Sequence, residues 1–250
     1  MSQRTLIHGF HAVIARLRHH PDSVHVVYLD EQRRDKRAHD LMRLAQEKGV
    51  RLILTEGTRV DEMARGRSQG VAALVEPVQL AQDLDQVLTG LAEPALLLVL
   101  DGVTDPHNLG ACLRSAEAFG AHAVVVPRDR SAGLTATALK AACGAAECLP
   151  FIPVTNLARS LRELKAQGVF LIGADQGADL MLPQVDLTGP IAWVLGSEGT
   201  GLRRLTRELC DWLARIPMQG EVESLNVSVA AGVCLYETRR QRAERTVAVS

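Results

Sequence analysis

Three stretches of the chain place polar residues between an apolar run and a run that favours a helix. They cover residues 96–116, 191–202 and 216–232. A strand that ends leaves its last carbonyl groups unpaired, and a helix that begins leaves up to four backbone N–H groups unpaired. Ser224 by itself is most simply a helix-capping residue. Three such loops in one chain, however, offer enough hydrogen-bond partners to indicate a site for a small polar ligand.

The three loops lack the signatures of common cofactor sites. Residues 101–104 contain a single glycine, so the dinucleotide motif Gly-x-Gly-x-x-Gly is absent, and residues 196–201 lack the Gly-Lys-Ser/Thr of a phosphate-binding loop. No set of histidine, cysteine and aspartate has metal-ligand spacing, so we expect no metal site. No nucleophile elbow indicates a Ser-His-Asp arrangement. The remaining amides, carbonyls and apolar walls suit a neutral heterocycle with a short zwitterion better than a polyphosphate.

The motifs inside the three loops occur together and in a fixed order. They are Asp105-Pro106-His107-Asn108 with Arg114, Gly196-Ser197-Glu198-Gly199, and Ile216-Pro217-Met218 followed by Ser224-Leu225-Asn226. In this combination they resemble the SpoU/TrmH family of RNA ribose 2′-O-methyltransferases, a branch of the SPOUT superfamily. The resemblance is strongest from about residue 94 to residue 238 and weaker before that.

The resemblance implies S-adenosylmethionine as the methyl donor and a guanosine ribose of 23S rRNA as the acceptor. Three alternatives remain open. A tRNA ribose 2′-O-methyltransferase of the same family would methylate a different RNA, although an N-terminal module of this size favours rRNA. A non-catalytic RNA-binding factor in ribosome assembly would bind RNA without methyl transfer. A nucleotide-dependent oxidoreductase would bind a dinucleotide.

The resemblance also assigns roles to residues in the three loops. Six positions match the family's adenosyl pocket: Leu195, Gly196, Ile216, Met218, Ser224 and Leu225. The catalytic set comprises Asn108, Arg114, Glu198, Ser224 and Asn226, the last two orienting the ribose or the arginine. Glu198 is expected to fix Asn108 or Arg114, or to accept a hydrogen bond from the target nucleoside. Gly196 and Gly199 have a simpler alternative, because a tight turn can require the positive φ that glycine adopts readily.

Arg114 is the residue whose role needs most argument. Methyl transfer requires the ribose hydroxyl to lose its proton, and the family assigns this arginine as the general base. Removing a proton from a guanidinium at pH 7 costs roughly 8 kcal/mol. We therefore expect Arg114 to hold an RNA phosphate and to stabilise developing alkoxide charge, with a surface salt bridge as the structural alternative. Gly110, one turn earlier, is expected to leave room for the arginine side chain.

The elements that must position these residues alternate along residues 94–250. Strands are expected at the apolar runs 96–100, 122–126, 169–172, 191–195 and 212–216, with a weaker one near 148–152. Helices are expected at about 108–119, 135–147, 156–167, 201–210 and 225–242. Apolar strands separated by helices predict an α/β fold with a parallel sheet covered by helices on both faces. The resemblance adds that this methyltransferase domain is an α/β knot, whose C-terminal part passes through a loop to form a trefoil knot.

Residues 1–77 predict a smaller α/β module, followed by a linker at 78–93. Helices are expected at 7–17, 40–48 and 61–65, and strands at 24–29, 50–54 and 71–75. The resemblance implies an RNA-binding fold similar to ribosomal protein L30. Four cations before the second helix are candidate RNA contacts or a solvated face: Arg33, Arg34, Lys36 and Arg37. Ser68 stands where relatives usually have histidine, so no role is assigned to it.

Charge and composition set broader limits. The formal net charge of −1 does not favour RNA binding. Residues 1–77, however, hold 13 Lys and Arg against 10 Asp and Glu, whereas the rest of the chain holds 15 against 19, so the N-terminal part is the better candidate to meet phosphate. Five cysteines without paired spacing indicate free thiols in a reducing cytoplasm. The apolar runs are too short to cross a bilayer.

The C-terminal helix carries two further expectations. In the family it packs with the first catalytic-domain helix across a two-fold axis, which implies a homodimer. The small residues Ala230, Ala231 and Cys234 fit such close packing. The basic run at 239–242 is expected to be a frayed, solvated helix end.

Overall fold

The computed structural model describes residues 4–76 and 83–249. The chain forms two compact units, one comprising Met1–Gln79 with Cys143–Cys148 and the other Leu80–Ala142 with Leu149–Ser250. The N-terminal unit thus includes a short segment from the middle of the chain, which the division expected from the sequence did not contain. No helix among the described residues is long and apolar enough to span a membrane.

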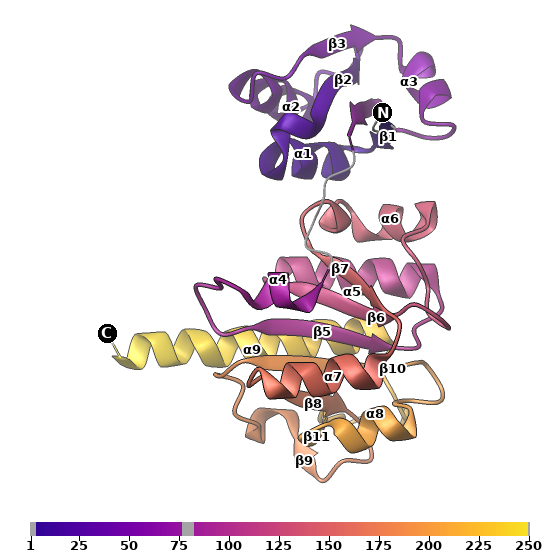
Figure 1. The fold of residues 1–250 in the computed structure, drawn as a ribbon. Coiled ribbons are helices and arrows are strands. Elements are labelled where there is room, and N and C mark those ends of the chain that lie inside the picture. Colours follow the sequence, from indigo (N-terminus) through magenta and orange to yellow (C-terminus); the bar gives the residue numbers. More distant parts are fainter. Residues whose placement is uncertain (1–3, 77–82, 250) are drawn as a thin grey trace. The chain divides into compact units, whose positions relative to one another are not determined.

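In its described part the N-terminal unit is a four-stranded sheet with three helices (Figure 1). The strands are β1 (Thr5–His8), β2 (Val24–Asp30), β3 (Leu52–Thr55) and β4 (Val71–Val75), in the order β1-β4-β2-β3. Strands β2 and β3 are parallel, whereas β4 is antiparallel to both β1 and β2. The helices are α1 (Phe10–His19), α2 (Lys36–Glu47) and α3 (Gly57–Met63), with a 3₁₀ turn at Pro21–Ser23. Phe10, Val13 and Leu41 belong to the core that these elements share.

The start of the first helix differs from the expectation of 7–17. Ile7 belongs to β1, where it lies opposite Ala73 of β4. Gly9 adopts a φ of 90° before α1 begins at Phe10. A strand of four residues is too short to show a clear alternation of polar and apolar residues. The helical apolar pattern that starts at residue 7 therefore hid it.

The second helix also begins earlier than expected. Asp35 caps α2, because its side chain accepts hydrogen bonds from the backbone N–H groups of Arg37 and Ala38. Lys36 and Arg37 therefore lie in the first turn of α2 and not in the loop before it. Cations oppose the dipole at the start of a helix, which is why the sequence pattern alone places this start too late. Gly49 ends the segment as predicted, with a φ of 67°.

Among the described residues, seven parallel strands form the sheet of the C-terminal unit (Figure 1). They are β5 (Leu96–Asp101), β6 (Ala123–Pro127), β7 (Phe151–Val154), β8 (Phe170–Ala174), β9 (Leu180–Met181), β10 (Ile191–Gly196) and β11 (Trp212–Arg215). Their order is β7-β6-β5-β10-β8-β11-β9, and each paired register is parallel. The predicted parallel sheet is confirmed. Strand β9 was not predicted, because two residues carry no periodic signal.

Helices cover both faces of this sheet (Figure 1). On one face lie α4 (Leu84–Leu88), α7 (Leu157–Ala166) and α8 (Arg204–Leu209), and on the other α5 (Pro106–Ala118) and α9 (Val227–Val249), with α6 (Ala136–Ala142) packed on α5. Successive strand residues point to opposite faces. Leu97 and Val99 join the core under α4 and α7, whereas Trp193 donates a hydrogen bond from Nε1 to Thr238 of α9 at 3.0 Å. Both faces are buried, which explains the uninterrupted apolar runs.

Gly110 has a different role from the one expected. A Cβ atom at this position would lie 2.4 Å from the carbonyl oxygen of Ala138 and 2.5 Å from the Cβ of Ala141. The missing side chain therefore lets α6 approach α5 closely, and it does not serve to make room for Arg114.

The basic run at 239–242 is not a frayed end. Arg239 donates to both carboxylate oxygens of Glu93 at 2.7 and 2.8 Å and to the carbonyl oxygens of Phe119 and Gly120. Arg242 donates to the carbonyl oxygens of Pro94, Ala95, Leu187 and Gly189. These carbonyls come just before β5 and β10 or just after α5, and that of Ala95 also accepts from the backbone N–H of Ile191 at 2.9 Å. The arginines thus tie α9 to the sheet. Burial accordingly lowers the pKa of Arg242.

The small residues of α9 do not form its exposed face. Ala231 and Cys234 are buried, and Ala230 lines a cavity that is described below. The groove between α5 and α9 is instead lined by Ser115, Phe119, Ser228, Val229, Gly232, Val233 and Tyr236. The helical period places Ala231 and Cys234 on the inner side of α9, and Val229 and Tyr236 on the outer side.

Candidate active site

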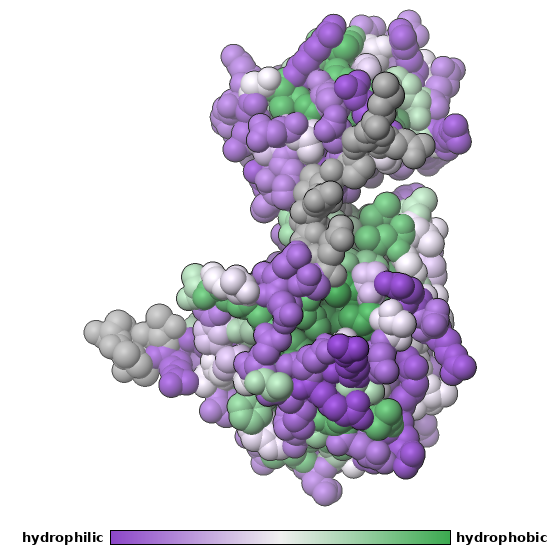
Figure 2. Space-filling view, in the orientation of Figure 1, coloured by the Kyte–Doolittle hydropathy of each residue, from purple (hydrophilic) through white to green (hydrophobic). Residues whose placement is uncertain are grey.

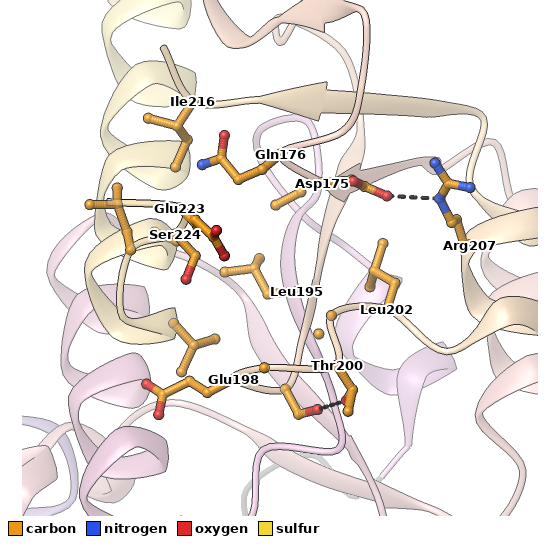
Figure 3. Close-up of a pocket in the computed structure, with 18 of the residues that line it drawn as sticks. Asp175, Gln176, Leu195, Glu198, Thr200, Leu202, Arg207, Ile216, Glu223 and Ser224 are labelled. Atoms are coloured by element: carbon orange, nitrogen blue, oxygen red, sulfur yellow. Dashed lines mark hydrogen bonds and ion pairs between the residues drawn. The ribbon is translucent and has the colours of Figure 1, made fainter. Parts of the chain in front are cut away.

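A cavity of about 610 Å³ lies where β8, β10 and β11 end at one edge of the sheet (Figure 3). Ligands of open parallel sheets bind at this edge, and the volume is typical of a site for a small molecule. Five of the six residues expected around an adenosyl group line the cavity: Leu195, Gly196, Ile216, Ser224 and Leu225. Met218 lies outside the lining, half-buried, and its Sδ accepts a hydrogen bond from Nε2 of the cavity residue Gln176 at 3.7 Å.

The loop after β10 folds back tightly beside this cavity. A Cβ atom at Gly196 would lie 2.0 Å from the carbonyl carbon of Gly201, so only glycine permits this approach. Gly199 and Gly201 adopt φ angles of 84° and 65°, and the backbone N–H of Gly201 donates to the carbonyl oxygen of Ser197 at 2.9 Å. The expectation of a positive φ therefore holds for Gly199, whereas Gly196 is required for close backbone approach.

An ion pair fixes the far end of the same loop. Asp101, buried at the end of β5, lies 2.6 Å from the guanidinium of Arg203 and accepts a hydrogen bond from its backbone N–H at 3.1 Å. The pair joins Asp101, in the first of the three predicted stretches, to the residue directly after the second. Sequence reasoning missed it, because 102 positions separate the two residues and no motif links them.

Three of the predicted catalytic residues form one hydrogen-bonded cluster. Asn108 and Asn226 each donate from Nδ2 to Oε1 of Glu198, at 3.0 and 2.6 Å, and Nδ2 of Asn226 also lies 2.9 Å from Oδ1 of Asn108. The residues come from three separate segments of the chain. The carboxylate of Glu198, which lines the cavity, therefore holds the starts of α5 and α9 against the loop after β10.

Two caps place the asparagines. Asp105 accepts a hydrogen bond from the backbone N–H of His107, and Pro106 occupies the first position of α5, so Asn108 falls in the first turn. Asn226 accepts at Oδ1 from the backbone N–H of Ser228 at 2.9 Å. The helix start expected near Ser224 is thus wrong, since the cap is Asn226 and α9 begins at Val227. The sequence does not show that Asn226 is the cap, because its contact with Glu198 in another loop leaves no mark on the residue pattern.

The remaining predicted residues occupy different positions. Arg114 has an exposed side chain on α5, the helix that carries Asn108. Ser224 is exposed at the cavity wall next to Glu223 (Figure 3). Burial, together with the charge of Glu198, raises the pKa of the Cys112 thiol on α5 to about 12, so this cysteine is a protonated core residue.

The sequence did not point to four polar residues that also line the cavity. Asp175 and Gln176 follow β8, Arg207 lies on α8, and Glu223 precedes Ser224. Asp175 lies 2.7 Å from Nε of Arg207 and accepts from the backbone N–H of Gly177 (Figure 3). The polar residues directly after the apolar run at 169–172 were a usable signal, because carboxyl ends of parallel strands share one edge.

The cations proposed for RNA contact lie on the N-terminal unit, whose visible face is largely hydrophilic (Figure 2). Arg33 is half-buried, with its guanidinium 4.9 Å from the ring centroid of Phe10 and Nη1 donating to the carbonyl oxygen of Gln69. Arg34, Lys36 and Arg37 are exposed. Arg33 therefore contributes to packing, while the other three remain accessible. In the described part of the chain, no group of three or more His, Cys, Asp and Glu side chains is arranged to hold a metal ion.

Comparisons with known families decide the relationship. The SpoU rRNA methylase family matches residues 95–236, and an RNA 2′-O ribose methyltransferase substrate-binding family matches residues 6–81. The chain belongs to the SpoU rRNA methylase family. The resemblance inferred from the three loops is thereby confirmed.

Relatives extend the match over nearly the whole chain. The chain is 58% identical to the 23S rRNA (guanosine-2′-O-)-methyltransferase RlmB of Nitrosomonas europaea, over 98% of this chain and 95% of the relative. It is 55% identical to the protein of the same name from Bordetella pertussis, over 97% and 99%.

Solved structures show the same fold in family members. The SpoU methyltransferase AviRb from Streptomyces viridochromogenes, in complex with the cofactor AdoMet, matches with a TM-score of 0.73 and 28% identity, over 96% of this chain and 91% of that one. An RNA 2′-O ribose methyltransferase matches with a TM-score of 0.77 and 27% identity, over 97% and 90%.

Proposed function

We propose that this SpoU-family protein transfers the methyl group of S-adenosylmethionine to the ribose 2′-oxygen of a guanosine in 23S rRNA. The observation that carries the proposal is the position of Glu198. This residue lines the cavity and at the same time accepts hydrogen bonds from Asn108 and Asn226. A donor site and a polar cluster able to orient a hydroxyl group therefore share one residue. The choice of 23S rRNA and of guanosine is based on the names of relatives that are more than half identical to this chain over almost its full length.

The residues of the cavity fit the donor. Leu195, Ile216 and Leu225 offer apolar surface for a heterocycle, and the backbone beside Gly196 stays open because a Cβ atom has no space there. When bound, S-adenosylmethionine supplies an electrophilic methyl group on a positively charged sulfur.

The residues around Glu198 have distinct proposed tasks. Asn108 and Asn226 hold the carboxylate of Glu198 in one orientation, so the acceptor ribose meets a preorganised surface. Arg114, exposed on α5, holds an RNA phosphate and stabilises the charge that develops on the ribose oxygen. Ser224, at the cavity wall, helps to orient the ribose.

We propose residues 1–77 as the RNA-binding domain, with an L30-like fold, and residues 94–250 as the methyltransferase domain. The match of residues 6–81 to a substrate-binding family supports this assignment. Of the linker proposed at 78–93, residues 78–82 lie outside the described residues, and the later part contains α4, which packs on the large sheet.

Three exposed cations can contact phosphates: Arg34, Lys36 and Arg37. Arg33 is half-buried against Phe10 and stabilises the segment that carries them. An rRNA substrate also supports a cytoplasmic location for the protein.

We further propose a trefoil knot and a homodimer. The knot rests on membership of the SpoU family, and the hydrogen bond between the start of α9 and the loop after β10 fits it. The dimer is supported by the groove between α5 and α9, where Val229 and Tyr236 are 51% and 55% exposed. Large apolar side chains rarely gather on the surface of a monomer without a partner.

Radiolabelled methyl transfer tests the proposed reaction. Purified protein is incubated with methyl-labelled S-adenosylmethionine and either 23S rRNA or total tRNA, and the labelled nucleoside is identified by nuclease digestion and mass spectrometry. The expected product is 2′-O-methylguanosine in 23S rRNA alone. Label in tRNA would instead indicate the tRNA-modifying branch, and RNA binding without any label would indicate an assembly factor.

A further inference from the structure

The charged side chains around the cavity differ in whether they have hydrogen-bond or ion-pair partners. Asp175, Glu198 and Glu223 contribute carboxylates, and Arg207 contributes a guanidinium. Asp175 pairs with Arg207 at 2.7 Å, and Glu198 accepts two amide hydrogen bonds. Glu223 makes no hydrogen bond or ion pair with any described residue. Figure 3 shows its carboxylate directed into the space between Ser224 and Leu195.

The four charged residues give the cavity a formal charge of −2. S-adenosylmethionine carries a sulfonium, an ammonium and a carboxylate, so its net charge is +1. During methyl transfer the carbon–sulfur bond breaks, its electron pair stays on sulfur, an oxygen–carbon bond forms, and the hydroxyl proton is released. The product S-adenosylhomocysteine is therefore neutral overall. A carboxylate without a partner attracts the cationic donor and gains nothing comparable from the neutral product.

We propose that Glu223 makes the cavity prefer the methyl donor over the demethylated product. The inference rests on the proposed function and adds a specificity residue to it. Asp175 is less suited to this task because Arg207 compensates its charge, and Glu198 because two amides hold its carboxylate in the polar cluster. Among the described cavity carboxylates, Glu223 alone has no hydrogen-bond or ion-pair partner. The preference lets the donor compete more effectively with the product for the free site.

Calorimetric titration of Glu223→Gln with three ligands tests the proposal. The ligands are S-adenosylmethionine, S-adenosylhomocysteine and sinefungin, in which an amine-bearing carbon replaces the sulfonium and keeps the positive charge. We expect the Kd values of the two cationic ligands to rise about fivefold and that of S-adenosylhomocysteine to change less than about twofold. Glu223→Asp, which keeps the charge, should retain most of the preference. Glu221→Gln is the matched control, since Glu221 is exposed and does not line the cavity.

Salt provides a second readout. In the wild type, raising the ionic strength from about 0.02 M to about 0.5 M should narrow the affinity difference between donor and product, because Glu223 is exposed and its charge is screened by salt. In Glu223→Gln the difference should depend less on salt. Equal weakening of all three ligands, or no change for any, would overturn the role of Glu223 while the proposed reaction stands. If the wild type binds none of the three, the proposed function fails and the inference fails with it.

Discussion

At the scale of single residues, the site depends on one carboxylate oxygen that accepts two amide donors. Asn226 performs two tasks with different atoms, since Nδ2 donates to Glu198 and Oδ1 caps α9. Side-chain substitutions can separate these tasks. The separation allows catalytic and structural contributions of one residue to be measured independently.

Asn226→Asp should remove catalysis while leaving the helix cap in place. Aspartate is as good a cap as asparagine, but it lacks the donor and places a second carboxylate beside Glu198. We expect kcat to fall by at least about a hundredfold, as for the loss of a preorganised donor. Asn226→Ala should add a loss of about 0.5–2 kcal/mol in unfolding free energy. Single-turnover methylation and urea unfolding measure the two effects, and an Asn226→Asp enzyme with wild-type kcat would contradict the assignment.

Gly196 should tolerate no side chain. Its Cβ would meet backbone atoms of Gly201, which cannot move aside as a flexible side chain can. We expect Gly196→Ala to lower the unfolding free energy by about 1–3 kcal/mol and to abolish binding of S-adenosylmethionine. Gly199→Ala meets no atom but carries a positive φ, so it should cost roughly 1–2 kcal/mol.

Gly220→Ala provides the neutral comparison, because nothing lies within 4 Å of its Cβ position and no positive φ is required. Urea unfolding and calorimetry should show the largest loss of stability and donor binding for Gly196→Ala, a smaller loss for Gly199→Ala and almost none for Gly220→Ala. Normal donor binding by Gly196→Ala would show that the loop after β10 can relax.

At the scale of elements, α9 is held at both ends. Asn226 fixes its start at the catalytic cluster, and Arg239 with Arg242 fixes its far part to the beginning of the sheet. His122 belongs to the same anchor. Its Nδ1 accepts from the backbone N–H of Leu96 at 3.0 Å, and its Nε2 lies 3.3 Å from Glu93. The imidazole is therefore held neutral, with its proton on Nε2.

This anchor should weaken in mild acid. Burial, helped by the charges of Arg239 and Arg242, lowers the pKa of His122 despite Glu93, so the unfolded chain binds a proton more readily than the folded one. The stability that His122 contributes is present above its ordinary pKa of about 6.5 and is lost as the pH falls. In His122→Asn the amide oxygen can still accept from Leu96 but does not titrate. Urea unfolding between about pH 7.5 and about pH 5.5 should show a smaller loss of stability in the variant than in the wild type. Equal losses would exclude His122 as the titrating group.

The sequence predicts elements well where burial imposes a long pattern. The apolar run at 96–100 and its counterparts give the strands of the large sheet, because a strand buried on both faces cannot hide polar residues. The charged run at 239–242 misleads for the opposite reason. Charges next to each other usually face water. Nothing in their spacing reveals that Arg239 and Arg242 donate hydrogen bonds to backbone carbonyls between other elements of the fold.

At the scale of the whole chain, the site is an arrangement of distant segments. Glu198 contacts residues from α5 and from the start of α9, and Asp101 holds Arg203 from another strand. Recognising the three loop motifs allowed Asn108, Glu198 and Asn226 to be grouped. The motifs did not reveal Arg207 or Glu223, because a helix after β10 and a loop after β11 bring them to the cavity through the strand order β10-β8-β11, which periodicity does not encode.

The apolar groove between α5 and α9 leads to the last prediction. Tyr236 is 55% exposed and meets Phe119 edge to face, with ring centroids 6.0 Å apart. If two chains pack through this groove, a charge there becomes buried and unpaired in the dimer, which is strongly unfavourable. Tyr236→Asp should therefore sediment as a single chain at concentrations where the wild type sediments as two. Leu205→Asp is the matched control, because Leu205 on α8 is 46% exposed but lies outside the groove. A wild type that sediments as one chain, or a Tyr236→Asp protein that stays paired, would locate the contact elsewhere or exclude it.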